Sequence, residues 1–309
     1  MKKYFILAAA AISFAACSND ENNNTVAENN AETITLTASV GEAEQTRAAN
    51  NIQSQAFLEN ELINVECTPS VTGTMTSVIY KAGAPDGENK NELTAQSAAL
   101  TWPASGTVAL KAFYPSTVKS ADTDFTVQTT QDDAGYKNSD LMYATDADGN
   151  AITALAKVAK VPLKFNHALS KVIVNVTNGN GMTASDVAAC TVEVYANTKV
   201  DIASGVADAV TAATPAWITL GTGSGQAAII VPQNITATAG DPVDFIRVTT
   251  AGSHAVTYQL KADKSFAAGK VYTYNLKVGM GTITLESSQI NNWDGAGNTI
   301  DETGNPLTF

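Results

Sequence analysis

Short runs of β-branched and aromatic residues, separated by Gly, Pro, Asn and Asp, constrain the fold of this chain more than any other feature. Several runs have the length and composition of strands, at residues 75–82, 107–115, 171–176, 191–196, 227–232, 245–250 and 270–278. Turn signals such as APDGEN, DADGN and NGNG separate some of them. No strand–helix–strand unit or solenoid repeat is visible. The pattern therefore predicts an all-β chain built from β-sandwiches.

Composition narrows the classes of function. The chain has 309 residues, enough for about two domains, and 44% of them are apolar. Its formal net charge of −12 argues against a nucleic-acid partner, which would need a basic face. No Cys or His spacing fits a metal site, and no nucleophile motif accompanies His167. We therefore expect no enzyme activity, no catalytic residue, no metal and no cofactor.

The N-terminus reads as an export signal. A basic MKK is followed by a short apolar stretch that ends in FAAC at Cys17. The ending resembles a bacterial lipobox, in which the cysteine is lipidated and becomes the new N-terminus; the alternative is an ordinary secretory signal. A polar, acidic run follows Cys17 and resembles the surface-export signal of Bacteroidales lipoproteins. Because export permits disulfides, Cys67 and Cys190 could pair, or both could be buried free thiols.

The tetrapeptide TITL occurs at residues 33–36 and again at 282–285. In the first copy the alternation continues to residue 40 and predicts a strand with one buried face, formed by Ile34, Leu36, Ala38 and Val40. An expected exposed loop over 41–51 follows and contains Arg47, one of two arginines in the chain.

The second TITL begins a new strand. Apolar residues fall on even positions up to Val278 and on odd positions from Ile283, so the phase flips across the glycines between them. The segment from Thr282 to Phe309 is polar apart from Ile283, Leu285, Ile290, Trp293, Ile300, Leu307 and Phe309. Trp293 in so polar a segment predicts a groove for its ring, on its own body or on another molecule. Trp102 and Trp217 could stack on sugars, but their strand-like surroundings favour core packing.

Five phrases in one order resemble the fimbrillin family, the type V pilins of Bacteroidales. They are LTWPASGTVALKAFYP (100–115), NSDLMYA (138–144), VPLKFNHALSKVIVNV (161–176), IIVPQ (229–233) and GKVYTYNLKV followed by INNW (269–293). The resemblance implies two transthyretin-like β-sandwich domains in tandem, with a C-terminal donor-strand segment. On this sequence the parts are a lipoprotein signal peptide (1–17), a propeptide with the first strand (18–47), an N-terminal domain (48–160), a C-terminal domain (161–281) and the donor segment (282–309).

The resemblance also implies a mechanism. Stalk subunits of the family are cut after an arginine behind the first strand, which corresponds here to Arg47–Ala48. The cut would displace the strand that carries Ile34, Leu36, Ala38 and Val40. The C-terminal segment of another subunit, with Ile283, Leu285, Ile290 and Trp293, would then fill the groove by strand addition.

The partners that this mechanism implies are other fimbrial subunits, including copies of the same chain, anchor and tip proteins, and an Arg-specific trypsin-like protease. The expected location is the outer membrane for the lipidated precursor and the extracellular fimbrium for the mature subunit. Two alternatives stay open at this point: a fimbrial anchor or tip subunit, and a surface lipoprotein that binds glycans through exposed aromatic residues.

Overall fold

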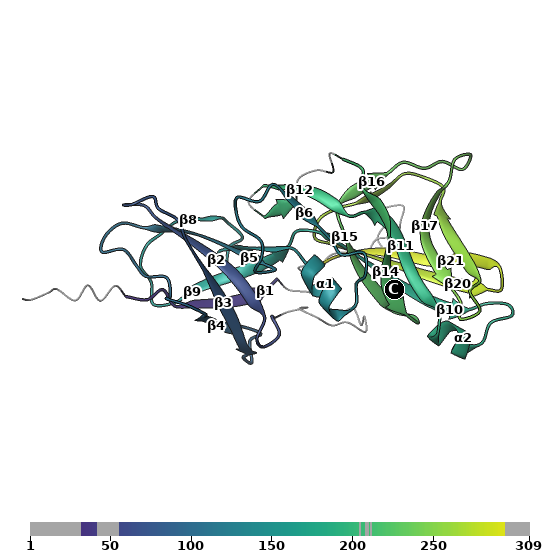
Figure 1. Ribbon diagram of the computed structural model, residues 1–309, viewed down its shortest axis with the longest axis horizontal. Helices are drawn as coiled ribbons and strands as arrows, with labels where there is room; N and C mark the ends of the chain where they lie inside the picture. The colour runs from purple at the N-terminus through teal and green to yellow at the C-terminus, as the bar shows by residue number, and fades with distance from the viewer. Residues whose placement is uncertain (1–31, 42–55, 204, 208–209, 211, 294–309) are drawn as a thin grey trace, which may run out of the picture. The chain divides into compact units, whose positions relative to one another are not determined.

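The computed structural model is nearly all strand, as predicted (Figure 1). It describes residues 32–41, 56–203, 205–207, 210 and 212–293. Within these ranges there are two short helices, α1 (Asp133–Ser139) and α2 (Ala184–Ala188), and neither is long and apolar enough to cross a membrane.

The first sheet has eight strands in the order β2-β3-β4-β1-β9-β7-β5-β8. Their bounds are β1 (Leu36–Val40), β2 (Leu62–Pro69), β3 (Thr76–Pro85), β4 (Asn91–Ala95), β5 (Val108–Tyr114), β7 (Met142–Thr145), β8 (Ile152–Leu155) and β9 (Val161–His167). Because β2 also pairs with β5, the sheet closes on itself. One apolar cluster fills it, hereafter the first core.

Two four-stranded sheets face each other in the second half of the chain. Their orders are β15-β10-β20-β21 and β14-β11-β17-β18. The bounds are β10 (Ser170–Asn178), β11 (Thr191–Asn197), β14 (Pro215–Thr222), β15 (Gln226–Ile230), β17 (Val243–Thr249), β18 (Ala255–Leu260), β20 (Lys270–Gly279) and β21 (Thr282–Asn292). The rings of Phe245 on β17 and Tyr274 on β20 meet across the gap at 5.3 Å, so the two sheets form a sandwich around a second core.

Smaller pairings complete the described fold. They join β6 (Asp124–Thr126) with β12 (Lys199–Ala203) and β13 (Val206–Ala207), and β16 (Gln233–Ile235) with β19 (Lys264–Phe266). The predicted turn at APDGEN joins β3 to β4. There the Asp86 carboxylate accepts hydrogen bonds from the backbone N–H groups of Glu88 and Lys90, which lower its pKa.

The two cores interleave along the chain. Phe113, Tyr136 and Leu141 pack into the second core, although residues on both sides of this stretch belong to the first. Phe165 on β9 still packs into the first core. The final change of core therefore comes after Phe165, whereas the sequence places the domain boundary at residue 160.

Candidate functional site

The first strand lies inside a sheet, with a hydrogen-bonded neighbour on each side (Figure 1). β1 pairs in parallel with β9 along its whole length and antiparallel with β4 at two positions. Backbone hydrogen bonds extend this insertion at both ends: the Ile34 N–H donates to the Leu100 carbonyl at 2.8 Å, and the Gly41 N–H donates to the Phe165 carbonyl at 2.9 Å. The stretch from 32 to 41 is thus a component of the sheet and not an appendage.

The side chains predicted to share one face of this strand are all buried. None is more than 5% exposed, and all pack into the first core: Ile34, Leu36, Ala38 and Val40. Thr37 is buried as well, which the alternation does not predict. Without the strand, an apolar floor would face solvent, together with the unpaired edges of β4 and β9.

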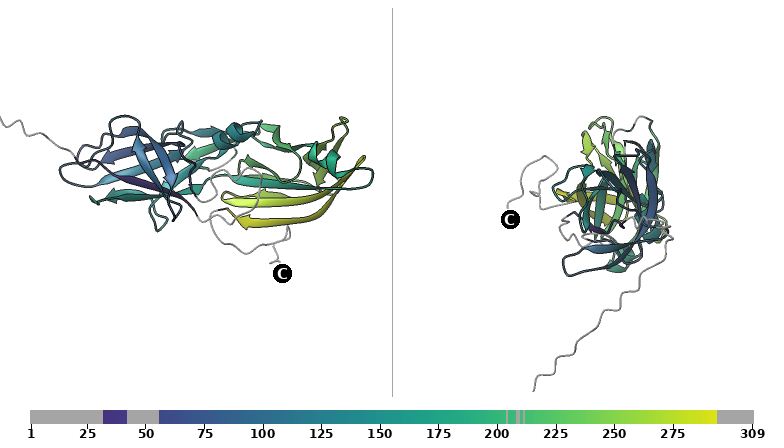
Figure 2. Two further views of the ribbon diagram at one scale, coloured as in Figure 1. Left: turned by 90° about the horizontal axis from the view of Figure 1, so that it is seen from below. Right: turned by 90° about the vertical axis from the view of Figure 1, so that its left-hand side faces the viewer.

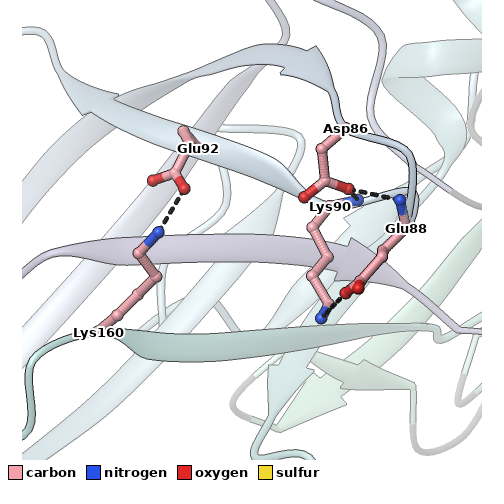
Figure 3. A network of polar contacts seen from close by, with 5 residues as sticks. All are labelled: Asp86, Glu88, Lys90, Glu92 and Lys160. Carbon is pink, nitrogen blue, oxygen red and sulfur yellow. Dashed lines mark hydrogen bonds and ion pairs between the residues drawn. The ribbon is translucent and has the colours of Figure 1, made fainter.

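Two ion pairs lie on the exposed side of the strand. Figure 3 shows Glu92 on β4 and Lys160, next to β9, reaching toward each other across β1, with 2.5 Å between the carboxylate Oε1 and Nζ. Lys157 forms a second pair with Glu32, at the start of the inserted stretch. All four side chains are about half exposed, and such pairs contribute little, about 0–1 kcal/mol each. The apolar face, and not the ion pairs, therefore holds the strand.

The second TITL lies at a sheet edge. As predicted, β20 ends at the glycines and a separate strand begins at Thr282; the turn is Met280–Gly281, where Gly281 has a φ of 85°. In the yellow hairpin of Figure 2, β21 pairs with β20 and has no second strand neighbour among the described residues. Ile283, Leu285 and Ile290 are partly buried against the second core.

Trp293 directly follows β21 and is buried, so its groove lies on its own chain. The indole stacks on the imidazole of His167, with ring centroids 3.9 Å apart and planes within 8°. His167 ends β9, and its Nδ1 lies 2.7 Å from Oδ1 of Asp140.

Sequence reasoning did not identify the cluster around Trp293. Asp140, His167 and Lys171 are all buried, and they come from two of the phrases quoted above, NSDLMYA and FNHALSK. Burial lowers the pKa of Lys171 to about 8, and the charge of Asp140 opposes this shift. The signal in the sequence was that these three polar residues lie in phrases that resemble the family. Nothing in the sequence predicts that they contact Trp293.

Three predicted site residues, Cys17, Arg47 and Ala48, lie outside the described residues. The other two cysteines are free and buried, Cys67 in the first core and Cys190 in the second. Burial raises the pKa of both thiols. The free-thiol alternative is therefore correct for this pair.

The remaining tryptophans lie in different environments. Trp102 is buried in the first core, as predicted. The same prediction is wrong for Trp217, which packs on the outer face of β14, next to Tyr195 and beneath the guanidinium of Arg247, 4.1 Å from its ring centre. Arg247 also bonds twice to Glu193, at 2.6 and 2.8 Å. No group of His, Cys, Asp and Glu side chains within the described ranges could hold a metal ion.

Comparisons with known proteins agree with this architecture. The sequence model of the fimbrillin-like family matches residues 46–293. A Bacteroides uniformis protein with a suggested role in cell adhesion has a similar structure, with 21% identity, a TM-score of 0.62, and coverage of 84% of this chain and 98% of that one. A Bacteroides ovatus protein of the same description has 16% identity, a TM-score of 0.60 and coverage of 86% and 99%. At these identities the likeness shows the fold. No curated protein sequence matches significantly.

Proposed function

Because this chain belongs to the fimbrillin-like family, we propose that it is a structural pilin subunit, which polymerises by protease-triggered strand exchange into a surface fimbria for adhesion. The observation that carries the proposal is the position of the first strand. Its four apolar side chains belong to the first core, and within the described ranges its neighbours in the sheet are β4 and β9. In this proposal the first strand can be removed. The groove that it occupies between β4 and β9, hereafter its bed, can then take another strand.

Cleavage after Arg47 would free this strand without cutting the sheet. Residues 32–41 would then be joined to the body only by hydrogen bonds, apolar contacts and weak ion pairs. Burial of the three large aliphatic side chains alone contributes roughly 5–9 kcal/mol, at about 1.5–3 kcal/mol each. A strand from a neighbour that offers similar side chains recovers this free energy and the hydrogen bonds of both edges. Such head-to-tail exchange does not close, so it produces a fibre.

The other arginine is a poor protease site. Arg247 lies in the middle of β17, between two paired strands, and its guanidinium is bound to Glu193 and covers Trp217. A protease that requires an accessible arginine would therefore not favour Arg247. We propose that the precursor reaches the outer membrane as a lipoprotein through Cys17, and that the cut releases it from the lipid. The proposal assigns no catalytic activity to the chain.

The donor in this scheme is the C-terminal segment from Thr282 to Phe309, and the acceptor is the bed of β1 in a neighbouring subunit. An anchor subunit would use the same fold differently, because it would keep its lipid and its first strand. The two roles therefore predict different N-termini for the mature protein.

The deciding experiment is to determine the N-terminal residue of the protein taken from the cell surface, by intact mass and terminal sequencing. We expect Ala48. A lipidated Cys17 would overturn the polymerising role and assign an anchor. Arg47→Ala should leave a lipidated precursor that forms no fibres. Arg47→Lys is the matched variant, since it keeps the charge and blocks only an arginine-specific protease. Normal fibres from Arg47→Ala would refute the cleavage step.

A further inference from the structure

Trp293 is fixed to the body by contacts on several sides. It is 5% exposed, its backbone N–H donates to the Gly269 carbonyl at 2.8 Å, and its ring lies flat on His167. The ammonium of Lys171 lies 5.6 Å from the indole centre and 5.7 Å from the ring centre of Tyr136. A large aromatic ring held in this way is a strong local anchor.

The surface beneath the indole is formed by buried polar side chains. His167 and Asp140 are 2.7 Å apart, and their side chains are each 1% exposed. The backbone next to them is also fixed, because the Ala168 N–H donates to the Leu141 carbonyl at 2.8 Å. Removal of the indole would take away its stack on the His167 ring and its contact with the Lys171 ammonium. Both contacts are attractive, so the cluster favours a bound Trp293.

β21 is held along its length as well as at this end. It pairs with β20 from Gly279↔Thr282 to Lys270↔Asn292, and a tight turn joins the two strands at the other end. Ile283, Leu285 and Ile290 pack on the second core of the same chain. To leave its subunit, β21 would have to lose the whole ladder, these contacts and the anchor.

We infer that Trp293 anchors β21 permanently in its own subunit, so that the segment passed to a neighbour is the chain after Trp293. This inference rests on the proposed strand exchange and revises its donor from residues 282–309 to residues 294–309. The second TITL is then a retained edge strand. The shorter donor consists of 16 residues (309 − 293) and includes Ile300, Leu307 and Phe309.

The length of this segment fits the task. The bed of the first strand takes ten residues, from 32 to 41 (41 − 31). At about 3.3 Å per residue, ten residues span roughly 33 Å and sixteen roughly 53 Å. The segment can therefore fill the bed and still leave about six residues to bridge the two subunits.

A covalent lock on β21 tests the inference. Asn275 and Ser287 are paired across β20 and β21, and the Asn275 Nδ2 donates to the Ser287 Oγ at 2.8 Å. Facing side chains of such a pair have nearly the Cβ separation that a disulfide needs. We would make Asn275→Cys with Ser287→Cys, confirm the cross-link by peptide mapping without reductant, and compare fibre formation before and after reduction.

If β21 stays in its subunit, the oxidised protein forms fibres as the reduced protein does. If β21 is donated, oxidation abolishes fibres, reduction restores them, and the inference is wrong. A second variant ends the chain at Trp293. It should accept a donor from wild-type protein but not elongate a fibre, and wild-type elongation by this truncated protein would also overturn the inference. Fibres that persist after removal of all residues from 282 onward would instead refute the strand exchange itself.

Hydrogen exchange measures directly how firmly Trp293 holds β21. Trp293→Ala should accelerate exchange of the β21 amides by about a hundredfold, since loss of a buried aromatic side chain opens the element that it holds. Trp293→Phe retains a ring above His167 and should restore most of the protection. Unchanged exchange in Trp293→Ala would mean that the stack does not hold β21.

Discussion

Leu36 and Leu285 occupy the same place in two identical tetrapeptides, yet we expect their replacement by alanine to have unequal effects. Leu36 is fully buried in β1, between β4 and β9. Leu285 is only partly buried in β21 and lines an open hollow of about 320 Å³ beside β18, together with Ile283 and Tyr258. The two leucines therefore share the same tetrapeptide but differ in how deeply their side chains are buried.

The magnitudes follow from this burial. Leu36→Ala removes a side chain from a closed core and should lower the free energy of unfolding by about 2–5 kcal/mol, the cost of a buried Leu→Ala change. Full burial of a leucine contributes about 1.5–3 kcal/mol. Since Leu285 is already partly hydrated and leaves no sealed cavity, Leu285→Ala should cost less than about 1.5 kcal/mol.

The assay is urea unfolding of the soluble precursor, followed by tryptophan fluorescence and by hydrogen exchange. Leu36→Ala should weaken the protection of β4 and β9, whereas Leu285→Ala should affect β20. Ser39→Ala, at a half-buried polar position of β1, is the control and should change stability by less than about 0.5 kcal/mol. Equal losses for the two leucines, or a loss below about 1 kcal/mol for Leu36→Ala, would refute the view that the first strand is held by its apolar face.

Three further predictions concern the second half of the fold. Gln131→Ala should cost about 2–4 kcal/mol in chemical denaturation, because the buried amide bonds to both the N–H and the carbonyl of Ile229 at 2.7 Å, and both groups would lose their partner. Gly135→Ala should cost about 3 kcal/mol or more in the same assay, because its Cβ would lie 1.9 Å from the Thr130 carbonyl oxygen; a loss below 1 kcal/mol would contradict that contact. Lys171→Met should stabilise the protein by up to about 3 kcal/mol at pH 7, since the lysine pKa falls on folding from 10.5 to about 8. Between pH 8 and pH 10.5 the unfolded lysine binds a proton that the folded one has lost, so wild-type stability should rise with pH relative to the variant. If the difference in free energy of unfolding between the two proteins does not close by pH 10.5, burial of the charge is not the cause of that difference.

The sequence predicts most strands because their two faces differ. In β20, Tyr272, Tyr274 and Leu276 alternate with more polar residues, and the structure buries them in the second core. The turn at APDGEN was equally predictable, since Asp86 supplies the side-chain acceptor that such a turn uses. These elements are encoded within ten residues or fewer.

β2 shows what the alternation does not predict. Its apolar and polar residues alternate as in a strand with one buried face, yet it is paired on both edges, to β3 and β5, and is buried on both faces. Its buried Asn64 looks like a surface residue in the sequence. In the structure the Asn64 amide donates to the Val118 carbonyl and accepts from the Ser77 hydroxyl. Partners up to 54 residues away decide whether this side chain is buried, and a local pattern contains no trace of them.

The two TITL copies show the same limit at the candidate site. A tetrapeptide determines which side chains share a face, and both copies do place their aliphatic residues toward a core. It does not determine how many strands flank it. The first copy has β4 on one side, 55 positions away (92 − 37), and β9 on the other, 125 positions away (161 − 36). Among the described residues, the second copy has β20 alone. The difference between an inserted strand and an edge strand arises from these distant pairings. The sequence repeat alone suggests that the copies are interchangeable, whereas their neighbours favour a removable strand at residues 32–41 and a retained one at residues 282–292.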